Sequence, residues 1–460
     1  MKEYDVLIIG LGAGGIGAAI KLSEDKRYKV AVVEKNERIG GTMIAAGVNT
    51  FEPGIAVGEV QRMLAERLIQ KGQGRVQRSL PALPDDRFGF SVDCDAPYWH
   101  TYHDEGILTT LQVRRFTFDD SAMEKEVLSV LQENGVEIYS GQTLTDAAVE
   151  NRRIKSVTVT DKSGKQTELS AKLYLDCTGN VSLAYLCGCE TTTAQESKSV
   201  YDEEFAPEKP LNEINGVSLI FRLSKDIDRD LEAEEEIKAI DISAWKENVL
   251  LKNDVWFCAN YYPNGDLYIN MLPTMTGKQY YSLSEEEAYK ICKARVFAFW
   301  KFLKRDERFA PYKLKSIFPV LGVREERRLV GEYVLTQHDV YKDAEKANAL
   351  ERFVAYSDHM IDSHGCSGPC PRLTHAYGIP YGCLLPKEID NMLVASKGCS
   401  FSHIAASSCR LSRTIMDIGE AAAKACIITL EKGIPLRDVK LHVEFFDSYS
   451  KLGQLLKKEI

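Results

Sequence analysis

The sequence predicts an α/β fold in which a parallel sheet is extended by a β-meander and a second, α+β lobe is inserted into the first. Strand, glycine turn, helix and strand succeed one another over residues 4–34, an alternation that is typical of a parallel sheet. Short strands separated by turn residues follow from 136 to 176. Residues 200–360 are richer in charged and aromatic side chains, which indicates a separate lobe.

The first unit contains a glycine-rich turn directly between a strand and a helix. The turn reads Gly10-Leu11-Gly12-Ala13-Gly14-Gly15. Glycines in this pattern allow a tight turn, a close approach of the backbone to a pyrophosphate, and close packing of helix on strand. The free N–H groups at the helix start attract the phosphate charge. The turn therefore predicts a Rossmann-like dinucleotide site, and an α/β turn without ligand is the alternative interpretation.

A carboxylate and a glycine pair follow the turn. Glu34 ends the second strand about 20 residues later, where its carboxylate can accept hydrogen bonds from a ribose diol, and Lys35 is its neighbour. Gly40, Gly41 and Thr42 come soon after, and a glycine pair lets the chain pass close to a long, extended cofactor such as FAD. Nicotinamide dehydrogenases share the glycine turn and the acidic residue, so those two features alone do not distinguish the cofactors.

Further elements follow from apolar periodicity and turn residues. Helices are predicted over 60–70 and 121–133, and a third, rich in small residues, runs through 419–425. The predicted strands of the meander and the second lobe are 136–139, 143–149, 154–160, 172–176, 217–223 and 267–272. Residues 72–112 are irregular and carry an aromatic cluster, for which a flap over a pocket and a packed loop are equally compatible interpretations. The cluster consists of Tyr98, Trp99 and Tyr102.

A four-residue segment that closes the meander connects the chain to a known family. It reads Asp176-Cys177-Thr178-Gly179. Together with the glycine turn and the glycine pair, it makes the chain resemble the FAD-dependent oxidoreductases of the glutathione-reductase and fumarate-reductase superfamily. In those proteins a D-A-T-G sequence returns here to the cofactor. This chain has Cys177 in place of the alanine and Asn180 where an acidic residue is usual.

The resemblance extends over most of the chain, to a bacterial group of FAD-dependent oxidoreductases. Residues 322–333 are similar to its R-E-x-R-R-x-x-G-x-Y segment, residues 362–364 to its D-x-H element, and residues 377–381 to its G-I-P-Y segment. Residues 391–395 look like the strand that returns to the flavin. That strand is usually followed by Gly-Arg, whereas this chain has Ser396-Lys397, which keeps the charge but loses the two-pronged contact of arginine.

The resemblance implies FAD as the cofactor and a discontinuous FAD-binding domain. The residues that we expect to contact FAD are Gly10, Gly12, Ala13, Gly14, Gly15, Glu34, Lys35, Gly40, Gly41, Thr42, Thr178, Gly179 and Lys397. The FAD-binding domain is expected to comprise 1–60, 110–200 and 375–460, and the substrate or cap domain 61–109 and 201–374.

Four residues are candidates for catalysis beside the flavin. His403 precedes a helix whose N-terminus points toward the flavin in the superfamily, and imidazole is suited to general acid or base catalysis. Arg410 is a candidate anchor for the flavin or for an anionic substrate group. Arg324 and His364 are candidates for the pocket wall. For each of the four, a purely structural role in packing, hydrogen bonding or ion pairing is the alternative.

The 12 cysteines show neither a disulfide framework nor the spacing of a metal site. No metal is therefore expected, and most thiols are interpreted as ordinary buried residues. A redox pair of Cys366 and Cys370 working with the flavin is a minor alternative, which replacement of both by serine would test.

Composition limits the partners. A net charge of −9 argues against nucleic acid, which requires a basic surface. No apolar run has the length of a membrane span and no signal peptide precedes the first strand, so we expect a cytoplasmic protein.

The sequence thus predicts an oxidoreductase that transfers hydride between flavin N5 and a small organic substrate. An alcohol or amine-type C–H bond and a conjugated C=C bond are the expected reacting groups. A NAD-dependent dehydrogenase and a non-catalytic, flavin-binding regulatory protein are the alternatives. The substrate, the electron donor or acceptor, and the oligomeric state are not predicted.

Overall fold

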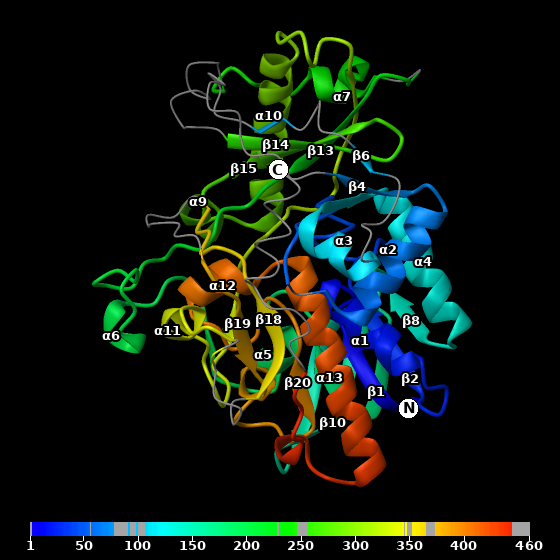
Figure 1. The fold of residues 1–460 in the computed structure, drawn as a ribbon, viewed down its shortest axis with the longest axis vertical. Helices are drawn as coiled ribbons and strands as arrows, with labels where there is room; N and C mark the ends of the chain where they lie inside the picture. Colours follow the sequence, from blue (N-terminus) through cyan, green and yellow to red (C-terminus); the bar gives the residue numbers. More distant parts are fainter. Residues whose placement is uncertain are drawn as a thin grey trace.

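The computed structural model describes residues 2–55, 57–77, 91–92, 98–99, 106–227, 230–245, 256–344, 346, 352–364 and 373–443. Its central sheet has seven strands: β1 Lys2–Ile9, β2 Val30–Glu34, β8 Glu137–Ser140, β9 Thr143–Glu150, β10 Arg153–Thr160, β11 Gln166–Asp176 and β20 Met392–Val394. Their order is β8-β2-β1-β11-β10-β9, with β20 beside the end of β11. The predicted parallel sheet with a β-meander is confirmed (Figure 1).

Strand β11 pairs with different neighbours along its length. Its first part is antiparallel to β10, and its last residues, from Tyr174 to Asp176, are parallel to β20. The register places Ile9 opposite Asp176, and Asp176 opposite Val394. The carboxyl ends of three strands therefore lie at one edge of the sheet, which brings the glycine turn, Cys177 and Ala395 together.

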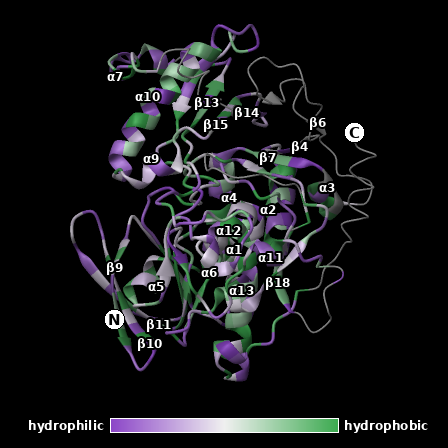
Figure 2. Cartoon of the chain, turned by 90° about the vertical axis from the view of Figure 1, so that its left-hand side faces the viewer, coloured by the Kyte–Doolittle hydropathy of each residue, from purple (hydrophilic) through white to green (hydrophobic). Residues whose placement is uncertain are grey.

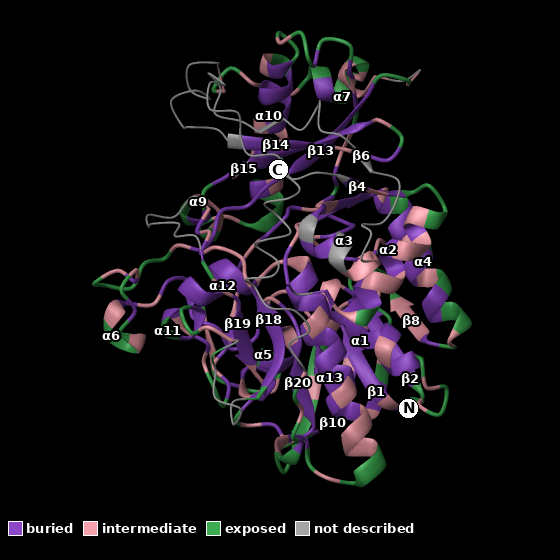
Figure 3. Ribbon diagram, in the orientation of Figure 1, coloured by how far each residue is buried: buried purple, intermediate pink, exposed green. Residues whose placement is uncertain are grey.

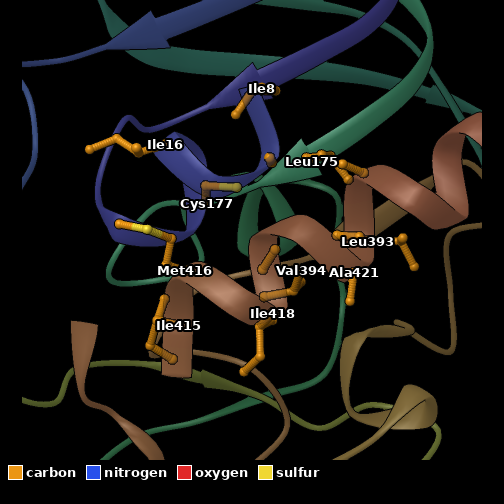
Figure 4. Close-up of a cluster of buried hydrophobic side chains, with 14 of the residues drawn as sticks. Ile8, Ile16, Leu175, Cys177, Leu393, Val394, Ile415, Met416, Ile418 and Ala421 are labelled. Atoms are coloured by element: carbon orange, nitrogen blue, oxygen red, sulfur yellow. The ribbon is translucent and has the colours of Figure 1, made fainter. Parts of the chain in front are cut away.

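Two helices cover this sheet and contact each other closely. Helix α1 is Ala13–Ser23 and helix α13 is Ser412–Lys432, which lie side by side in Figure 1. A Cβ atom on Gly14 would lie 1.9 Å from the Ala395 carbonyl oxygen, and one on Gly419 would lie 2.0 Å from that of Gly14. Glycines are therefore required for this contact, and apolar residues of the two helices and the strands fill the core beneath it (Figure 4).

The first lobe continues in a smaller sheet and two further helices. The sheet, in the order β3-β7-β4-β6, consists of β3 Thr50–Phe51, β7 Arg115–Phe118, β4 Gly74–Gln77 and β6 Tyr98–Trp99. Helix α2 is Glu59–Gln70 and helix α4 is Asp120–Glu133, close to the predicted bounds. Helix α4 begins where expected because the Asp119 carboxylate accepts a hydrogen bond from Ala122 N at 3.0 Å. Tyr102 and the side chains of Tyr98 and Trp99 lie outside the described residues, so the aromatic cluster stays a prediction.

The second lobe forms its own sheet and core. The sheet has the order β16-β13-β15-β14-β5, with β16 Lys313–Ile317, β13 Ile220–Ser224, β15 Leu267–Leu272, β14 Trp256–Tyr261 and β5 Ser91–Val92. Helix α10, Glu285–Leu303, packs against it, and the core comprises apolar residues between Val217 and Val323 (Figure 1, upper part). The main core of the first lobe extends from Tyr4 to Cys189 and resumes at Leu329. The domain boundaries proposed above remain a prediction.

The other elements are short. They are α3 Ile107–Val113, α5 Ser182–Leu186, β12 Thr191–Thr192, α6 Lys198–Tyr201, η2 Leu231–Ala233, α7 Glu235–Lys238, α9 Gly277–Tyr281, β17 Arg328–Leu329, α11 Gln337–Val340, β18 Phe353–Ser357, β19 Tyr377–Pro380, η3 Tyr381–Leu384, α12 His403–Cys409 and η4 Leu436–Asp438.

Burial differs strongly among these elements. Figure 3 shows that α1, α12, β18 and β19 are largely buried, whereas α6 and the far end of α13 reach the surface. Figure 2 shows that β9 and its turn project from the body of the first lobe. Within the described ranges, no helix combines the length and the apolar character needed to cross a bilayer.

Candidate active site

The glycine turn leaves a bare backbone surface at the start of α1. Gly10 has φ +95°, which requires glycine, and Gly12 is the N-cap residue of α1 without a side-chain cap. A Cβ atom on Gly12 would meet no atom of the described residues within 4 Å, in contrast to the crowded Gly14. Open space therefore faces the uncapped helix start, as the approach of a pyrophosphate requires.

The acidic residue lies beside this turn. The Glu34 carboxylate accepts hydrogen bonds from Leu11 N at 2.8 Å and Asn36 N at 2.9 Å, and the residue is 5% exposed. Lys35 is exposed next to it. Asn36 Nδ2 also donates to it, at 3.1 Å, and a carboxylate with about four acceptor sites is able to accept a ribose hydroxyl as well.

The glycine pair completes the cradle. Gly40 and Gly41 have φ +86° and +48°, and Gly40 N donates to the Leu11 carbonyl at 2.8 Å. A Cβ atom on Gly41 would lie 3.4 Å from Gly12 Cα, so two side-chain-free backbones face each other. Thr42 continues this segment. The residues present thus fit an extended dinucleotide such as FAD.

The segment after the meander is organised by a buried carboxylate. Asp176 accepts hydrogen bonds from Thr178 N at 3.0 Å, Thr178 Oγ1 at 2.6 Å and Ala184 N at 2.9 Å. Burial raises the pKa of Asp176, and these hydrogen bonds oppose that shift. The carboxylate therefore holds the turn at Thr178 and Gly179. This turn lies next to the glycine turn, because a Cβ atom on Gly10 would be 2.8 Å from the Cys177 carbonyl oxygen.

Lys397 lies at Gly179, with contacts of its own. Its Nζ donates to the Val323 carbonyl and lies 3.2 Å from Glu326 Oε2. A Cβ atom on Gly179 would be 2.9 Å from Lys397 Cε. The structure therefore brings Lys397 beside the expected FAD contacts, while its charge is paired with Glu326.

The segment beyond the glycine pair leads to the second lobe. Gly47, with φ +81°, packs on Phe318, whose ring a Cβ atom would approach to 2.6 Å. A Cβ atom added to Gly322 would lie 4.0 Å from Ala46 Cβ. Because Gly322 is two residues from Arg324, this segment connects the dinucleotide cradle with the catalytic candidates.

Arg324, Asp362, His364 and Arg410 form one group, termed here the arginine–histidine cluster. His364 Nε2 lies 2.6 Å from Asp362 Oδ2, and Arg410 Nη2 donates to the Asp362 carbonyl at 2.9 Å. Arg324 donates to Gly216 O at 2.7 Å, and Gly216 N donates to His364 O at 2.7 Å. Three of the four predicted catalytic residues are thus brought together.

Electrostatics give the cluster a positive charge. Burial and the neighbouring Arg324 lower the pKa of His364 to about 4, although Asp362 opposes them. Burial would raise the pKa of Asp362, but the bond from His364 and the charge of Arg410 lower it below its usual range. At neutral pH, two guanidinium groups therefore face one carboxylate and a neutral imidazole.

The fourth candidate, His403, belongs to a neighbouring buried group, the Glu325 network, which consists of Glu196, Glu325, Arg328 and His403. His403 Nδ1 lies 3.0 Å from Glu325 Oε1 and 2.9 Å from Oε2. Arg328, fully buried, pairs with both carboxylates and donates to the Phe401 carbonyl at 3.0 Å. His403 Nε2 is buried and has no hydrogen-bond partner among the described residues.

In the sequence, Glu325 is recognisable only as part of the 322–333 segment, and its contact with His403 is not predicted. Nor does the sequence identify Glu196, which lies 129 residues from Glu325, or the ion pair of Arg413 with Asp358. No motif signals these contacts, because they join segments far apart in the chain. Cys366 and Cys370 lie outside the described residues, so the redox pair stays untested.

Comparison with known proteins agrees with the cofactor geometry. The sequence matches the family described as FAD dependent oxidoreductase over residues 5–454. A segment of 56 residues is 46% identical to the mitochondrial electron transfer flavoprotein-ubiquinone oxidoreductase of Arabidopsis thaliana, covering 11% of this chain and 8% of that protein. The chain therefore spans less than a tenth of that relative's length.

Solved structures show a distant likeness. A geranylgeranyl bacteriochlorophyll reductase-like protein of Thermoplasma acidophilum is 10% identical with a TM-score of 0.47, over 100% of this chain and 84% of that one. The myxobacterial halogenase CndH is 11% identical with a TM-score of 0.48, over 100% of this chain and 79% of that one. With the family match covering nearly the whole sequence, the chain belongs to the FAD dependent oxidoreductases.

Proposed function

We propose that this enzyme transfers hydride between N5 of its FAD and a small organic substrate that carries a negatively charged group. The flavin supplies the hydride chemistry itself, by accepting or donating hydride at N5. The observation that supports the proposal is the arginine–histidine cluster, which lies where the segment after the dinucleotide cradle contacts the second lobe. An alcohol or amine-type C–H bond, or a conjugated C=C bond, is the proposed reacting group.

The charge of the cluster suits an anion. Arg410 Nε is buried and has no hydrogen-bond partner within the described part of the chain. Burial, together with the charge of Arg410, lowers the pKa of Arg324 to about 10, so the guanidinium stays protonated at neutral pH. A substrate carboxylate would supply both the missing acceptor and the missing negative charge.

Two histidines provide proton acceptors. Since ionised Asp362 only accepts hydrogen bonds, His364 donates through Nε2, and in its neutral ring Nδ1 is the acceptor. His403 has the opposite arrangement, with Nδ1 at Glu325 and with Nε2 lacking a partner in the described ranges. In the proposed reaction the arginines bind and orient the substrate, and His403 exchanges the proton.

A substrate screen tests the proposal. Purified enzyme loaded with FAD is mixed anaerobically with alcohols, amines and their carboxylated analogues, and the flavin band near about 450 nm is followed. We expect bleaching by a carboxylated member, or reoxidation of the reduced enzyme by an unsaturated acid. An enzyme that no member reduces or reoxidises would contradict the proposal.

Arginine variants test the anion site with the same assay. Arg410→Gln is expected to raise KM for the charged substrate about ten- to hundred-fold, because a charge-assisted hydrogen bond is lost. The control is Arg152→Gln, which removes an exposed arginine that pairs with Asp390 on the first lobe. Equal effects of the two variants on KM would argue against substrate binding by Arg410.

The alternatives of the sequence interpretation are less well supported. A NAD-dependent dehydrogenase does not account for the family match over residues 5–454. A non-catalytic flavin-binding regulator does not account for a buried, net positive cluster in which one guanidinium nitrogen has no partner among the described residues.

A further inference from the structure

The Glu325 network lies directly beside the arginine–histidine cluster. Arg324 and Glu325 are adjacent in the chain, and Asn215, next to Gly216, donates to both Glu325 and Ser407. Glu325 is 2% exposed and His403 1% exposed. The pair of Glu325 and His403 is therefore buried. It is connected to the proposed substrate site because Glu325 follows Arg324 in the chain and its partner Asn215 precedes Gly216.

The hydrogen bonds of Glu325 determine where His403 holds its proton. Its carboxylate accepts from Asn215 N at 2.9 Å and Asn215 Nδ2 at 2.8 Å, and it is paired with Arg328. Burial opposes ionisation, but His403 and Arg328 lower the pKa of Glu325 to about 2. An ionised carboxylate has no proton to donate, so the contact with His403 requires the proton on Nδ1.

The other ring nitrogen then has a defined role. Nε2 is buried and lacks a partner among the described residues, and a buried polar atom without a partner is costly unless a ligand satisfies it. We propose that Glu325 is a positioning residue that fixes the His403 proton on Nδ1 and thereby presents Nε2 as the nitrogen that exchanges a proton with the substrate. This inference rests on the proposed function.

The surrounding groups are compatible with proton exchange at Nε2. Glu196 accepts a hydrogen bond from the His403 backbone N at 3.0 Å, and Arg328 links Glu196 to Glu325. Glu203 accepts hydrogen bonds from Ser402 Oγ and from Gln337 N at 2.7 Å, and Tyr201 lies near Arg328 and Glu196. The carboxylates outnumber the single guanidinium, so they balance the charge that a second proton brings to the ring.

Nitrogen NMR of the FAD-loaded enzyme with labelled histidines tests the tautomer without a substrate. The chain has eight histidines, and the spectrum of His403→Gln identifies the signal. When the ring carries a single proton, we expect that proton on Nδ1 and an unprotonated Nε2, because ionised Glu325 only accepts hydrogen bonds. A singly protonated ring with its proton on Nε2 would overturn the inference, whether or not the Glu325 variants fold.

The variant Glu325→Gln tests the positioning role. We expect it to retain FAD, to shift the His403 tautomer toward Nε2–H, and to slow flavin reduction by the substrate from the screen at least about ten-fold. Glu325→Asp should restore part of the rate and the Nδ1–H form. Its pH profile should resemble that of the unmodified enzyme, which a merely structural role does not require.

The control is Glu126→Gln, which removes another buried carboxylate that pairs with two cations, Arg67 and Lys71, far from the site. An unchanged tautomer and rate in folded Glu325→Gln, or an equal loss of rate in the control, would overturn the inference. If no substrate reduces the flavin, the proposed function fails while the tautomer measurement still decides the role of Glu325.

Discussion

Gly12 and Gly14 belong to the same turn but have opposite surroundings. A side chain on Gly14 would collide with the Ala395 carbonyl, whereas one on Gly12 would enter open space. Sequence reasoning assigns both to the dinucleotide motif, and the structure assigns the packing contact to Gly14 and the exposed backbone to Gly12. A substitution at Gly14 should therefore reduce mainly the stability of the fold, and one at Gly12 mainly the affinity for the cofactor.

We expect Gly14→Ala to destabilise the fold by about 1–3 kcal/mol, since the added methyl group overpacks the contact of α1 with the end of β20. Gly12→Ala should leave the free energy of unfolding of the apoprotein within about 0.5 kcal/mol but weaken FAD binding about ten-fold or more. Urea unfolding and titration of flavin fluorescence measure the two effects. Equal losses of stability in both variants would contradict this assignment.

His364 makes stability depend on pH. Its pKa is lowered to about 4 from an ordinary value of 6.5, so the unfolded chain binds a proton more readily than the folded one. The stability that it contributes is present above pH 6.5 and is lost as the pH falls toward 4, by roughly 1–3 kcal/mol. Urea unfolding at both ends of this range should show a smaller loss in His364→Asn. An unchanged pH dependence in that variant would refute the prediction.

Residues that belong to a local sequence motif could be identified from the sequence. Contacts between residues far apart in the chain could not. Glu34 and the glycine pair follow from spacing alone, because each has a local requirement for its residue type. Lys397 and Glu326 lie 71 residues apart, and nothing local to either signals their pairing. The same holds for Glu325 and His403.

At the scale of elements, the start of α2 is held by two carboxylates of α13. Asp417 Oδ1 accepts from Gly58 N at 2.9 Å, and Glu420 accepts from Val60 N at 2.8 Å and Glu59 N at 3.2 Å. A Cβ atom on Gly58 would lie 2.4 Å from an oxygen of each, so the two carboxylates are close neighbours. Burial raises the pKa of both, and the charge of Glu420 raises that of Asp417 further.

An acid whose pKa is raised by folding contributes stability at low pH that is lost as the pH rises. Asp417→Asn keeps an acceptor for Gly58 N and removes the charge, so we expect it to stabilise the protein at about pH 8 more than at about pH 5. Urea unfolding at the two pH values measures the difference. Glu126→Gln provides a control of opposite sign, because Lys71 and Arg67 overcome the effect of burial and lower the pKa of Glu126. A loss of stability in Asp417→Asn at pH 8 would refute the prediction.

Helices with one apolar face were predictable to within a residue or two, as α2 and α4 show. Helix α10 was not, because the buried residues from Val296 to Trp300 are consecutive and obscure the helical period. Its start has a local signal in the capping box of Ser284 and Glu287, which holds the first turn.

At the scale of the whole molecule, Arg222 joins the two lobes. From β13 of the second lobe it donates to Asp266 at 2.7 Å, and it reaches Asp119 at 3.2 Å and Asp120 at 3.3 Å at the start of α4. Its guanidinium lies 3.6 Å from the ring centroid of Tyr262. One buried cation thus serves carboxylates of both lobes.

Arg222→Met leaves these carboxylates without their shared partner, so we expect a loss of about 3–5 kcal/mol and separate unfolding of the two lobes. Differential scanning calorimetry of the FAD-loaded protein should resolve two transitions where the unmodified protein has one. Lys315→Met removes a cation from Asp266 within the second lobe and should preserve a single transition. A single transition in both variants would show that Arg222 does not couple the lobes.

The central sheet was predictable where the glycine turn and the meander determine the direction of its strands. The family resemblance added the prediction of its last strand, at residues 391–395. The packing of Gly47 on Phe318 and the contacts of Arg222 were not predictable. Each joins residues of different lobes, and no local sequence pattern indicates which residues of the two lobes meet. Arg324, His364 and Arg410 were predicted as candidates, but their arrangement around Asp362 was not, because it depends on contacts between distant segments.

The pairing of β20 with β11 and the packing of α13 on α1 have a consequence for synthesis on the ribosome. The cofactor cradle consists of residues 10–42, but its sheet lacks one strand until Val394 has emerged, and α1 lacks its cover until Lys432 has emerged. Such distant partners give the first lobe a high contact order and delay its closure. The second lobe, whose core falls between Val217 and Val323, is fully translated earlier. We therefore expect cofactor capture to await the synthesis of β20 and α13.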